Sequence, residues 1–195
     1  MNCSLNWFCE WQDLAGAVLG GGALVWTVWL TLSSEQRKSK EESRALRIAL
    51  GVELRQCVRY VLKGYQNVVS LIESGSISTS KTLRDSLRFP DPVIYPKSAS
   101  RVGVLGEHTH MFVEFYCQLW SVPDGVYERY PEESKLQRAG LVGVAESLLE
   151  LAEIGIKALP AFAGMPGSEL DGQLQKDTAE ARAEIMSLKD RTPEK

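Results

Sequence analysis

Histidine is scarce in this sequence, and the common catalytic signatures are absent. The 195 residues include only two histidines, His108 and His110. There is no C-x-x-C pair, no phosphate-binding G-x-x-x-x-G-K-[ST] loop, and no G-x-S-x-G or H-E-x-x-H motif. A hydrolytic triad requires a histidine beside its nucleophile, and only two histidines are present. A di-iron site requires the Glu-x-x-His motif twice, which His108 and His110 cannot supply. These absences argue against an enzyme, and no cofactor is expected.

Strand patterns and an excess of basic charge are also missing. No segment of useful length alternates apolar and polar residues, so the sequence predicts an all-α fold. The 22 Lys and Arg residues are outnumbered by 25 Asp and Glu residues, which gives a net charge of −3 at pH 7. Non-specific nucleic-acid binding needs a basic face, so no nucleic-acid partner is expected.

Charge is completely absent from Leu14 to Leu32, which read LAGAVLGGGALVWTVWLTL. A helix needs about 20 apolar residues to cross the hydrocarbon core of a bilayer. We therefore predict one transmembrane helix at 14–32, with the lipid bilayer as its partner. A cleaved signal peptide is an alternative, but it requires a basic start and a shorter apolar run. A buried helix of a globular protein is another, although Gly20–Gly22 would weaken it.

The residues that flank this segment predict its orientation. Residues 1–13 contain no Lys or Arg, whereas the other flank carries a basic cluster made of Arg37, Lys38, Lys40, Arg44 and Arg47. The basic flank of a transmembrane helix stays on the cytoplasmic side. Its positive charges are also attracted to anionic lipid headgroups. We expect a protein of the inner (plasma) membrane, with residues 1–13 outside and the C-terminal part in the cytoplasm.

A strip of small residues lies on the predicted transmembrane helix. Gly16 and Gly20 form a G-x-x-x-G pair, and Ala17 and Gly21 repeat the spacing one position later. Small side chains let two membrane helices approach closely, so this strip indicates a homodimer. The alternative is a glycine-rich helix without a partner.

Residues 33–189 are expected to form a helical domain with a membrane-proximal stalk, and 190–195 a disordered tail. Apolar residues recur at steps of three and four, which is typical of helices that bury one face. The expected apolar positions are Leu46, Leu50, Leu54, Cys57, Val58, Val61, Leu62, Tyr65, Val68, Val69 and Ile72 in 34–73, Met111, Phe112, Phe115, Tyr116, Leu119 and Trp120 in 107–120, and Leu170, Leu174, Ala181, Ile185 and Leu188 in 168–188. The pattern predicts a bundle of three to four principal helices, within 34–73, 107–120, 131–159 and 168–188. A loop is expected at 122–130 and a linker at 161–167, because both contain Pro and Gly.

One stretch carries a family resemblance. The residues IYPKSASRVGVLG at 94–106, followed by VEFY at 113–116, resemble uncharacterised bacterial and phage-associated proteins with a single membrane helix. The resemblance implies a membrane-anchored helical protein and no activity. From the residues alone, we expect Tyr95 and 102–105 to pack under the long helix, the alternative being a ligand groove.

The function expected from the sequence is a membrane-anchored interaction domain that tethers, scaffolds or regulates a protein partner. One alternative is a metal or small-ligand sensor, because Glu107, His110 and Glu114 recur at steps of three and four. Another is a phage envelope accessory protein with the reversed topology.

Overall fold

The described chain is built from helices. The computed structural model describes residues 4–74, 81, 83, 87, 89–129 and 137–190, and of these it gives the backbone alone for 4–25, 27, 28, 123, 124 and 126–129. The elements are α1 (Ser4–Ser74), α3 (Ile94–Ser98), η1 (Ala99–His108), α4 (Thr109–Arg129), α5 (Arg138–Ala158), η2 (Leu159–Phe162), η3 (Ser168–Leu170) and α6 (Asp171–Asp190), where η denotes a 3₁₀ helix. No strand occurs in these ranges, which confirms the predicted all-α class.

The chain divides into two compact units, Met1–Ala45 and Leu46–Lys195, and α1 contributes residues to both. In the first unit, every large apolar side chain that the structure describes is exposed, namely Trp26, Trp29, Leu30 and Leu32. The rings of Trp26 and Trp29 lie 5.5 Å apart. Within the described residues, no helix combines the length and the apolar character that a membrane crossing requires. Most side chains of the predicted span 14–32 lie outside the described part of the chain.

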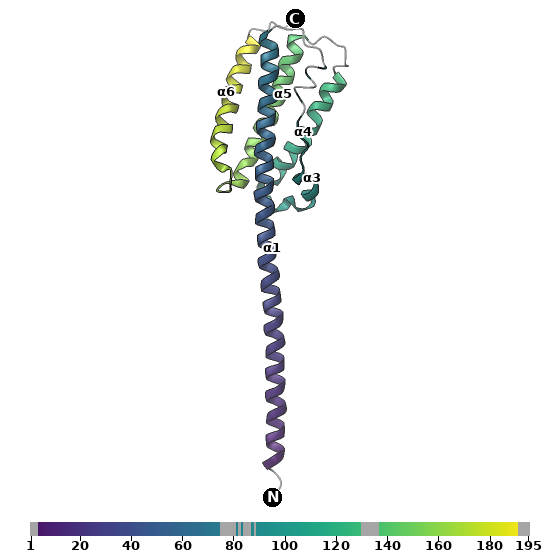
Figure 1. The fold of residues 1–195 in the computed structure, drawn as a ribbon, viewed down its shortest axis with the longest axis vertical. Helices are drawn as coiled ribbons and strands as arrows, with labels where there is room; N and C mark the ends of the chain where they lie inside the picture. Colours follow the sequence, from purple (N-terminus) through teal and green to yellow (C-terminus); the bar gives the residue numbers. More distant parts are fainter. Residues whose placement is uncertain are drawn as a thin grey trace. The chain divides into compact units, whose positions relative to one another are not determined.

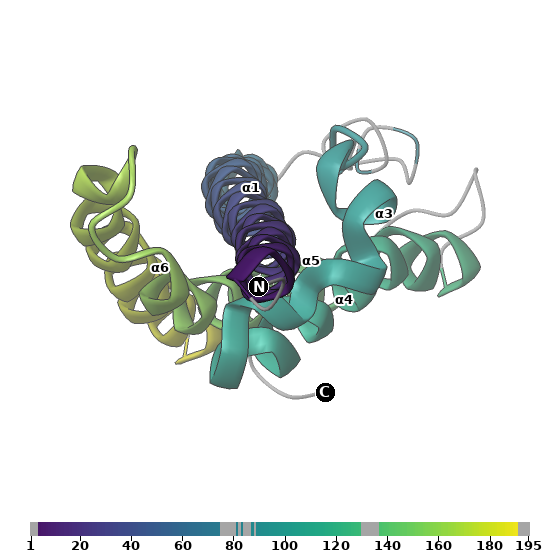
Figure 2. The same ribbon diagram turned by 90° about the horizontal axis from the view of Figure 1, so that it is seen from below.

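The second unit is a bundle around the C-terminal part of α1. Figure 1 shows α6 on one side of this part of α1 and α3 and α4 on the other, and the view in Figure 2 agrees. Helix α5 contacts both α4 and α6. Four long helices therefore form the unit, which confirms the predicted helical bundle.

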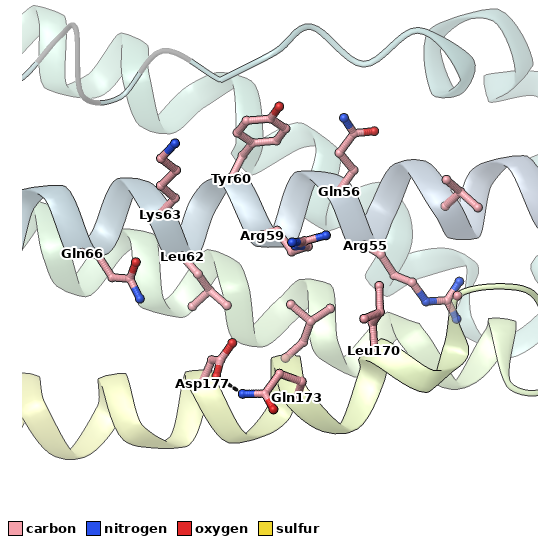
Figure 3. Close-up of a pocket in the computed structure, with 13 residues that line it drawn as sticks. Arg55, Gln56, Arg59, Tyr60, Leu62, Lys63, Gln66, Leu170, Gln173 and Asp177 are labelled. Carbon is pink, nitrogen blue, oxygen red and sulfur yellow. Dashed lines mark hydrogen bonds between the residues drawn. The ribbon is translucent and has the colours of Figure 1, made fainter.

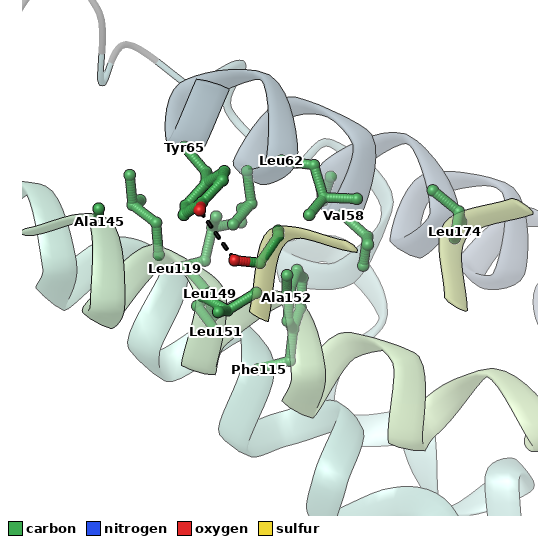
Figure 4. Packing of buried hydrophobic residues seen from close by; sticks show 14 of the residues in the cluster. Val58, Leu62, Tyr65, Phe115, Leu119, Ala145, Leu149, Leu151, Ala152 and Leu174 are labelled. Carbon is green, nitrogen blue, oxygen red and sulfur yellow. Dashed lines mark hydrogen bonds between the residues drawn. The ribbon is translucent and has the colours of Figure 1, made fainter. Parts of the chain in front are cut away.

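The core of this unit lies where α1 faces the other helices. Of the α1 positions predicted as one apolar stripe, Leu46 is only partly buried. The others are buried, namely Leu50, Leu54, Cys57, Val58, Val61, Leu62, Tyr65, Val68, Val69 and Ile72. Leu148, Leu149 and Ala152 of α5 are also fully buried. Figure 4 shows Tyr65 beside Leu62 in this core, with its hydroxyl directed to a hydrogen-bond partner. That partner is the carbonyl oxygen of Ala181 on α6, at 2.9 Å.

Several predicted details are wrong. The expected loop at 122–130 is helical as far as Arg129, because α4 continues through Pro123 and Gly125. The expected helix at 131–159 is observed from Arg138, and residues 131–136 lie outside the described part. Leu170, which was expected on the buried face of the last helix, is exposed. It precedes α6 in η3, so it does not follow the 3.6-residue period of that helix.

The irregular segment before α4 packs into the core as expected. Tyr95, Val102 and Leu105 are buried. The Tyr95 ring stacks on Tyr116 with 4.3 Å between ring centroids. Gly106 adopts φ 63° and ψ −130°, a conformation that favours glycine, and it makes a kink inside η1 shortly before α4 begins. This segment therefore completes the core and is not a free loop.

At Gly155, α5 packs tightly against α1 and α4. A Cβ atom there would lie 2.4 Å from Val58 Cγ2 and 2.8 Å from Phe115 Cε2. We expect Gly155→Ala to lower the free energy of unfolding by about 1–3 kcal/mol, because the added methyl overpacks the core. Urea denaturation of the full chain in mild detergent, followed by circular dichroism, measures this loss.

Gly143 on the same helix provides the matched control. No atom lies within 4 Å of a Cβ placed there. Gly143→Ala should raise the free energy of unfolding by about 0.4–1 kcal/mol, since alanine has the better helix propensity. Equal effects of the two substitutions would contradict the close packing at Gly155.

Candidate functional site

A buried arginine on α1 holds the start of α6. The Arg55 side chain is only 3% exposed, and its guanidinium meets the Asp171 carboxylate through two hydrogen bonds. The distances are 2.7 Å from Nε to Oδ1 and 3.0 Å from Nη2 to Oδ2. Two parallel bonds of this kind fix orientation as well as distance. Asp171 is also the first residue of α6, where a negative charge favours the helix dipole.

The same guanidinium fixes the connection between α5 and α6. Its Nη2 donates to the carbonyl oxygen of Phe162 at 3.3 Å, and its Nη1 donates to that of Pro166 at 3.4 Å. A single side chain of α1 therefore positions the segment predicted as a linker and the helix that follows it.

The buried Glu53, two residues before Arg55 on α1, holds the start of α3. Glu53 Oε1 accepts hydrogen bonds from the amides of Val93 and Ile94, both at 2.6 Å. Its Oε2 accepts from the amide of Tyr95 at 2.9 Å and from the Tyr116 hydroxyl at 3.2 Å. No local side chain caps α3, so this distant carboxylate satisfies its first amides.

The thiol and phenol beside Glu53 are poor nucleophiles. Burial and the nearby Glu53 carboxylate raise the pKa of Cys57 to about 12. Burial, Cys57 and Glu53 also raise the pKa of Tyr116. Both groups therefore stay protonated at neutral pH, whereas a catalytic cysteine requires a lowered pKa. The cluster fits a structural role.

An open groove runs between α1 and α6. Its volume is about 730 Å³, and its lining includes Arg55, Leu62, Leu170, Gln173, Leu174 and Asp177. Figure 3 shows Leu170, Gln173 and Asp177 from the α6 side, with Gln56, Tyr60 and Lys63 along the outer edge of α1. A smaller hollow of about 320 Å³ continues it past Tyr65 and Glu184. We call the larger hollow the α1–α6 groove.

The α1–α6 groove has an apolar floor and exposed apolar edges. Leu62 and Leu174 are buried at its base. Val52 is 47% exposed, Leu170 40% and Tyr60 38%. Apolar side chains that converge on one concave surface are typical of binding sites.

The charged groups in and beside the α1–α6 groove differ in their partners. Asp177 accepts from Gln173 at 2.5 Å, Glu180 pairs with Lys176 at 3.7 Å, and Glu184 lies 3.1 Å from the Tyr65 hydroxyl. Arg59 and Lys63 are exposed, and their charged groups form no ion pair with any residue that the structure describes. The Gln173 amide and the Tyr65 hydroxyl are neutral and leave the charges of Asp177 and Glu184 in place. In the lining of the α1–α6 groove itself, the cations Arg59 and Lys63 on α1 outnumber the one carboxylate on α6, so the α1 edge carries the positive charge.

The residues predicted from the sequence lie elsewhere. For Gly16, Ala17, Gly20 and Gly21 the structure describes the helical backbone alone, so the homodimer stays a prediction. In the predicted basic cluster, Arg37, Lys38, Lys40 and Arg44 are exposed. Arg47 differs from them, because it is partly buried and donates a hydrogen bond to the carbonyl oxygen of Val104.

The alternative metal site finds no geometric support. Within the described residues, no group of three His, Cys, Asp or Glu side chains is arranged to hold a metal ion. Glu107 belongs to η1, whereas His110 and Glu114 belong to α4, so the three residues do not share one regular helix. His110 Nδ1 lies 2.9 Å from the carbonyl oxygen of Glu107, and Glu114 accepts from Gln118 at 3.3 Å.

Comparison with known protein families, with curated proteins and with solved structures finds no match to this chain. The family resemblance at 94–116 therefore stays a prediction. The groove is interpreted from its geometry and charge alone.

Proposed function

We propose that this chain is a single-pass membrane protein that presents a helical, protein-binding domain on the cytoplasmic side. The domain is the second compact unit, which begins at Leu46. Its work would be to tether, scaffold or regulate a partner at the membrane surface. The observation that carries the binding role is the α1–α6 groove, where exposed apolar side chains lie beside unpaired cations.

Two observations support the membrane anchor. Residues 14–32 carry no charge and have the length of a bilayer crossing. In the same region, Trp26 is 63% exposed and Trp29 is 59% exposed, so these rings do not pack into the folded chain. Indole rings of this kind favour the interface between lipid and water.

The anchor is tested by membrane extraction. We expect the full chain to stay in the membrane pellet after alkaline carbonate treatment. Replacing both Ala23 and Leu24 with Arg should release it, because each arginine near the helix centre costs about 2.5–3.5 kcal/mol of insertion free energy. The matched control replaces the same residues with Ile. Release of the unmodified chain by carbonate would overturn the anchor.

Orientation is tested separately. A reporter that is active only in the periplasm, fused after Lys195, should be silent in the orientation proposed. Neutral replacement of the exposed cations Arg37, Lys38, Lys40 and Arg44 should let part of the population invert. Strong reporter activity in the unmodified fusion would favour the reversed topology instead.

A further inference from the structure

We infer that the α1–α6 groove is the docking site for an acidic amphipathic helix of a partner protein. This inference rests on the proposed function, and it names the surface and the chemistry of the partner. The occupant is argued from the shape of the groove, from its apolar floor and from its unbalanced charge.

The shape suits a helix. The groove lies between two neighbouring helices, α1 and α6, and its lining on α1 extends from Val52 to Gln66 (Figure 3). At 1.5 Å per residue this wall is about 20 Å long, which matches about four turns of a partner helix. Side chains of a third helix insert into a channel of this kind, as in other helix-in-groove complexes.

The apolar floor of the groove favours a partner helix that has one apolar face. Leu62 and Leu174 close the bottom, while Val52 and Leu170 are left exposed at one end. Apolar residues at i, i+3, i+4 and i+7 of a partner helix would cover these side chains and remove them from water. Val52 and Leu170 are exposed to water in the isolated chain, and the docked helix would bury them.

The cations on the α1 edge of the groove favour acidic residues beside the apolar face of the partner helix. Arg59 and Lys63 lie four residues apart on α1, so they are separated by about one helical turn. Neither cation has an ion-pair partner in the described chain, and the Asp177 carboxylate of the lining belongs to α6, on the opposite wall of the groove. Two acidic residues at i and i+4 on the α1 side of the docked helix would pair with Arg59 and Lys63. The net charge of the whole chain is −3, so this positive edge is a local feature.

Three synthetic 18-residue helices test the inference. They share one leucine face at i, i+3, i+4 and i+7 and differ only in flanking residues, which are Glu, Gln or Lys. Binding to the full chain in lipid nanodiscs is measured by fluorescence anisotropy. We expect the Glu peptide to bind about tenfold more tightly than the Lys peptide, with a preference that shrinks at high salt.

Charge reversal of the groove gives the decisive comparison. The double variant Arg59→Glu, Lys63→Glu should reverse the order, so that the Lys peptide binds more tightly. Reversal at two exposed lysines on other surfaces, Lys97→Glu with Lys157→Glu, should leave the order unchanged. Leu170→Asp should weaken all three peptides, because it places a charge beside the apolar floor.

Other occupants give different results, each of which overturns the inference. Binding of phosphatidylglycerol vesicles that depends on Arg59 and Lys63, without peptide binding, would assign the groove to lipid. A dimer in sedimentation that the double variant abolishes would assign it to a second copy of the chain. A peptide order that the charge reversal leaves unchanged would rule out the groove as the site. Carbonate extraction of the same variants reports on the anchor independently, so failure of one proposal is distinguishable from failure of the other.

Discussion

Asp171→Ala is expected to lower the free energy of unfolding by about 3–5 kcal/mol, because it leaves the buried Arg55 guanidinium without its carboxylate. Asp171 is 16% exposed and Arg55 3% exposed, so water replaces little of the lost interaction. The loss should be largest at the start of α6, which Arg55 fixes through both oxygens of Asp171. Urea denaturation of the full chain in mild detergent measures the total effect, and hydrogen exchange locates it.

Two further variants separate the ion pair from general damage. Arg55→Met combined with Asp171→Leu should cost much less than Asp171→Ala alone, because neither charge is then left buried. Lys176→Ala removes an exposed pair with Glu180 on the same helix and should change the free energy of unfolding by less than about 0.5 kcal/mol. If Asp171→Ala has an effect as small as that of Lys176→Ala, Arg55 does not hold the start of α6.

The helices of the bundle were predictable because their apolar faces are periodic. On α1, positions from Leu50 to Ile72 recur at steps of three and four, and all of those predicted to be buried in this range are buried. At Leu170 the rule fails because this residue lies in η3, before α6 begins. It also fails at Trp120, which lies on α4 and is exposed. Periodicity says which face of a helix is apolar, but it does not say where a neighbouring helix stops covering that face.

The buried charges were not predictable from local sequence. Glu53 and Arg55 flank Leu54 on α1, and a charged residue at the edge of an apolar stripe usually faces solvent. Their partners come from distant parts of the chain, since Asp171 lies 116 residues after Arg55. The only local hint is that two opposite charges stand on either side of a leucine in the apolar stripe of α1.

The groove was not predictable for a related reason. It depends on which helix lies beside α1, and the sequence alone does not order the helices around the bundle. Arg59 and Lys63 look like ordinary solvated residues until α6 is placed next to α1 and forms no ion pair with either of them in the described part of the chain. Arg59 and Lys63 indicate a binding site only once the structure places them beside the apolar floor of the groove.

Glu53→Ala should have an effect at least as large as that of Asp171→Ala, because one carboxylate satisfies several buried donors. The substitution removes the acceptor for the amides of Val93, Ile94 and Tyr95. Each donor left without a partner costs about 1–3 kcal/mol, so for three amides we expect a loss of about 3–9 kcal/mol in the free energy of unfolding. Glu53→Gln should lose less, since an amide oxygen still accepts from one part of the segment.

Hydrogen exchange distinguishes this capping role from simple core damage. In the unmodified chain, the amides of residues 93–95 should exchange slowly. In Glu53→Ala they should exchange faster under native conditions, before the rest of α4 and α5 opens. Glu73→Ala, at an exposed position near the end of α1, should leave the exchange of these three amides unchanged. Continued protection of these amides in Glu53→Ala would show that Glu53 is not the group that holds α3 against α1.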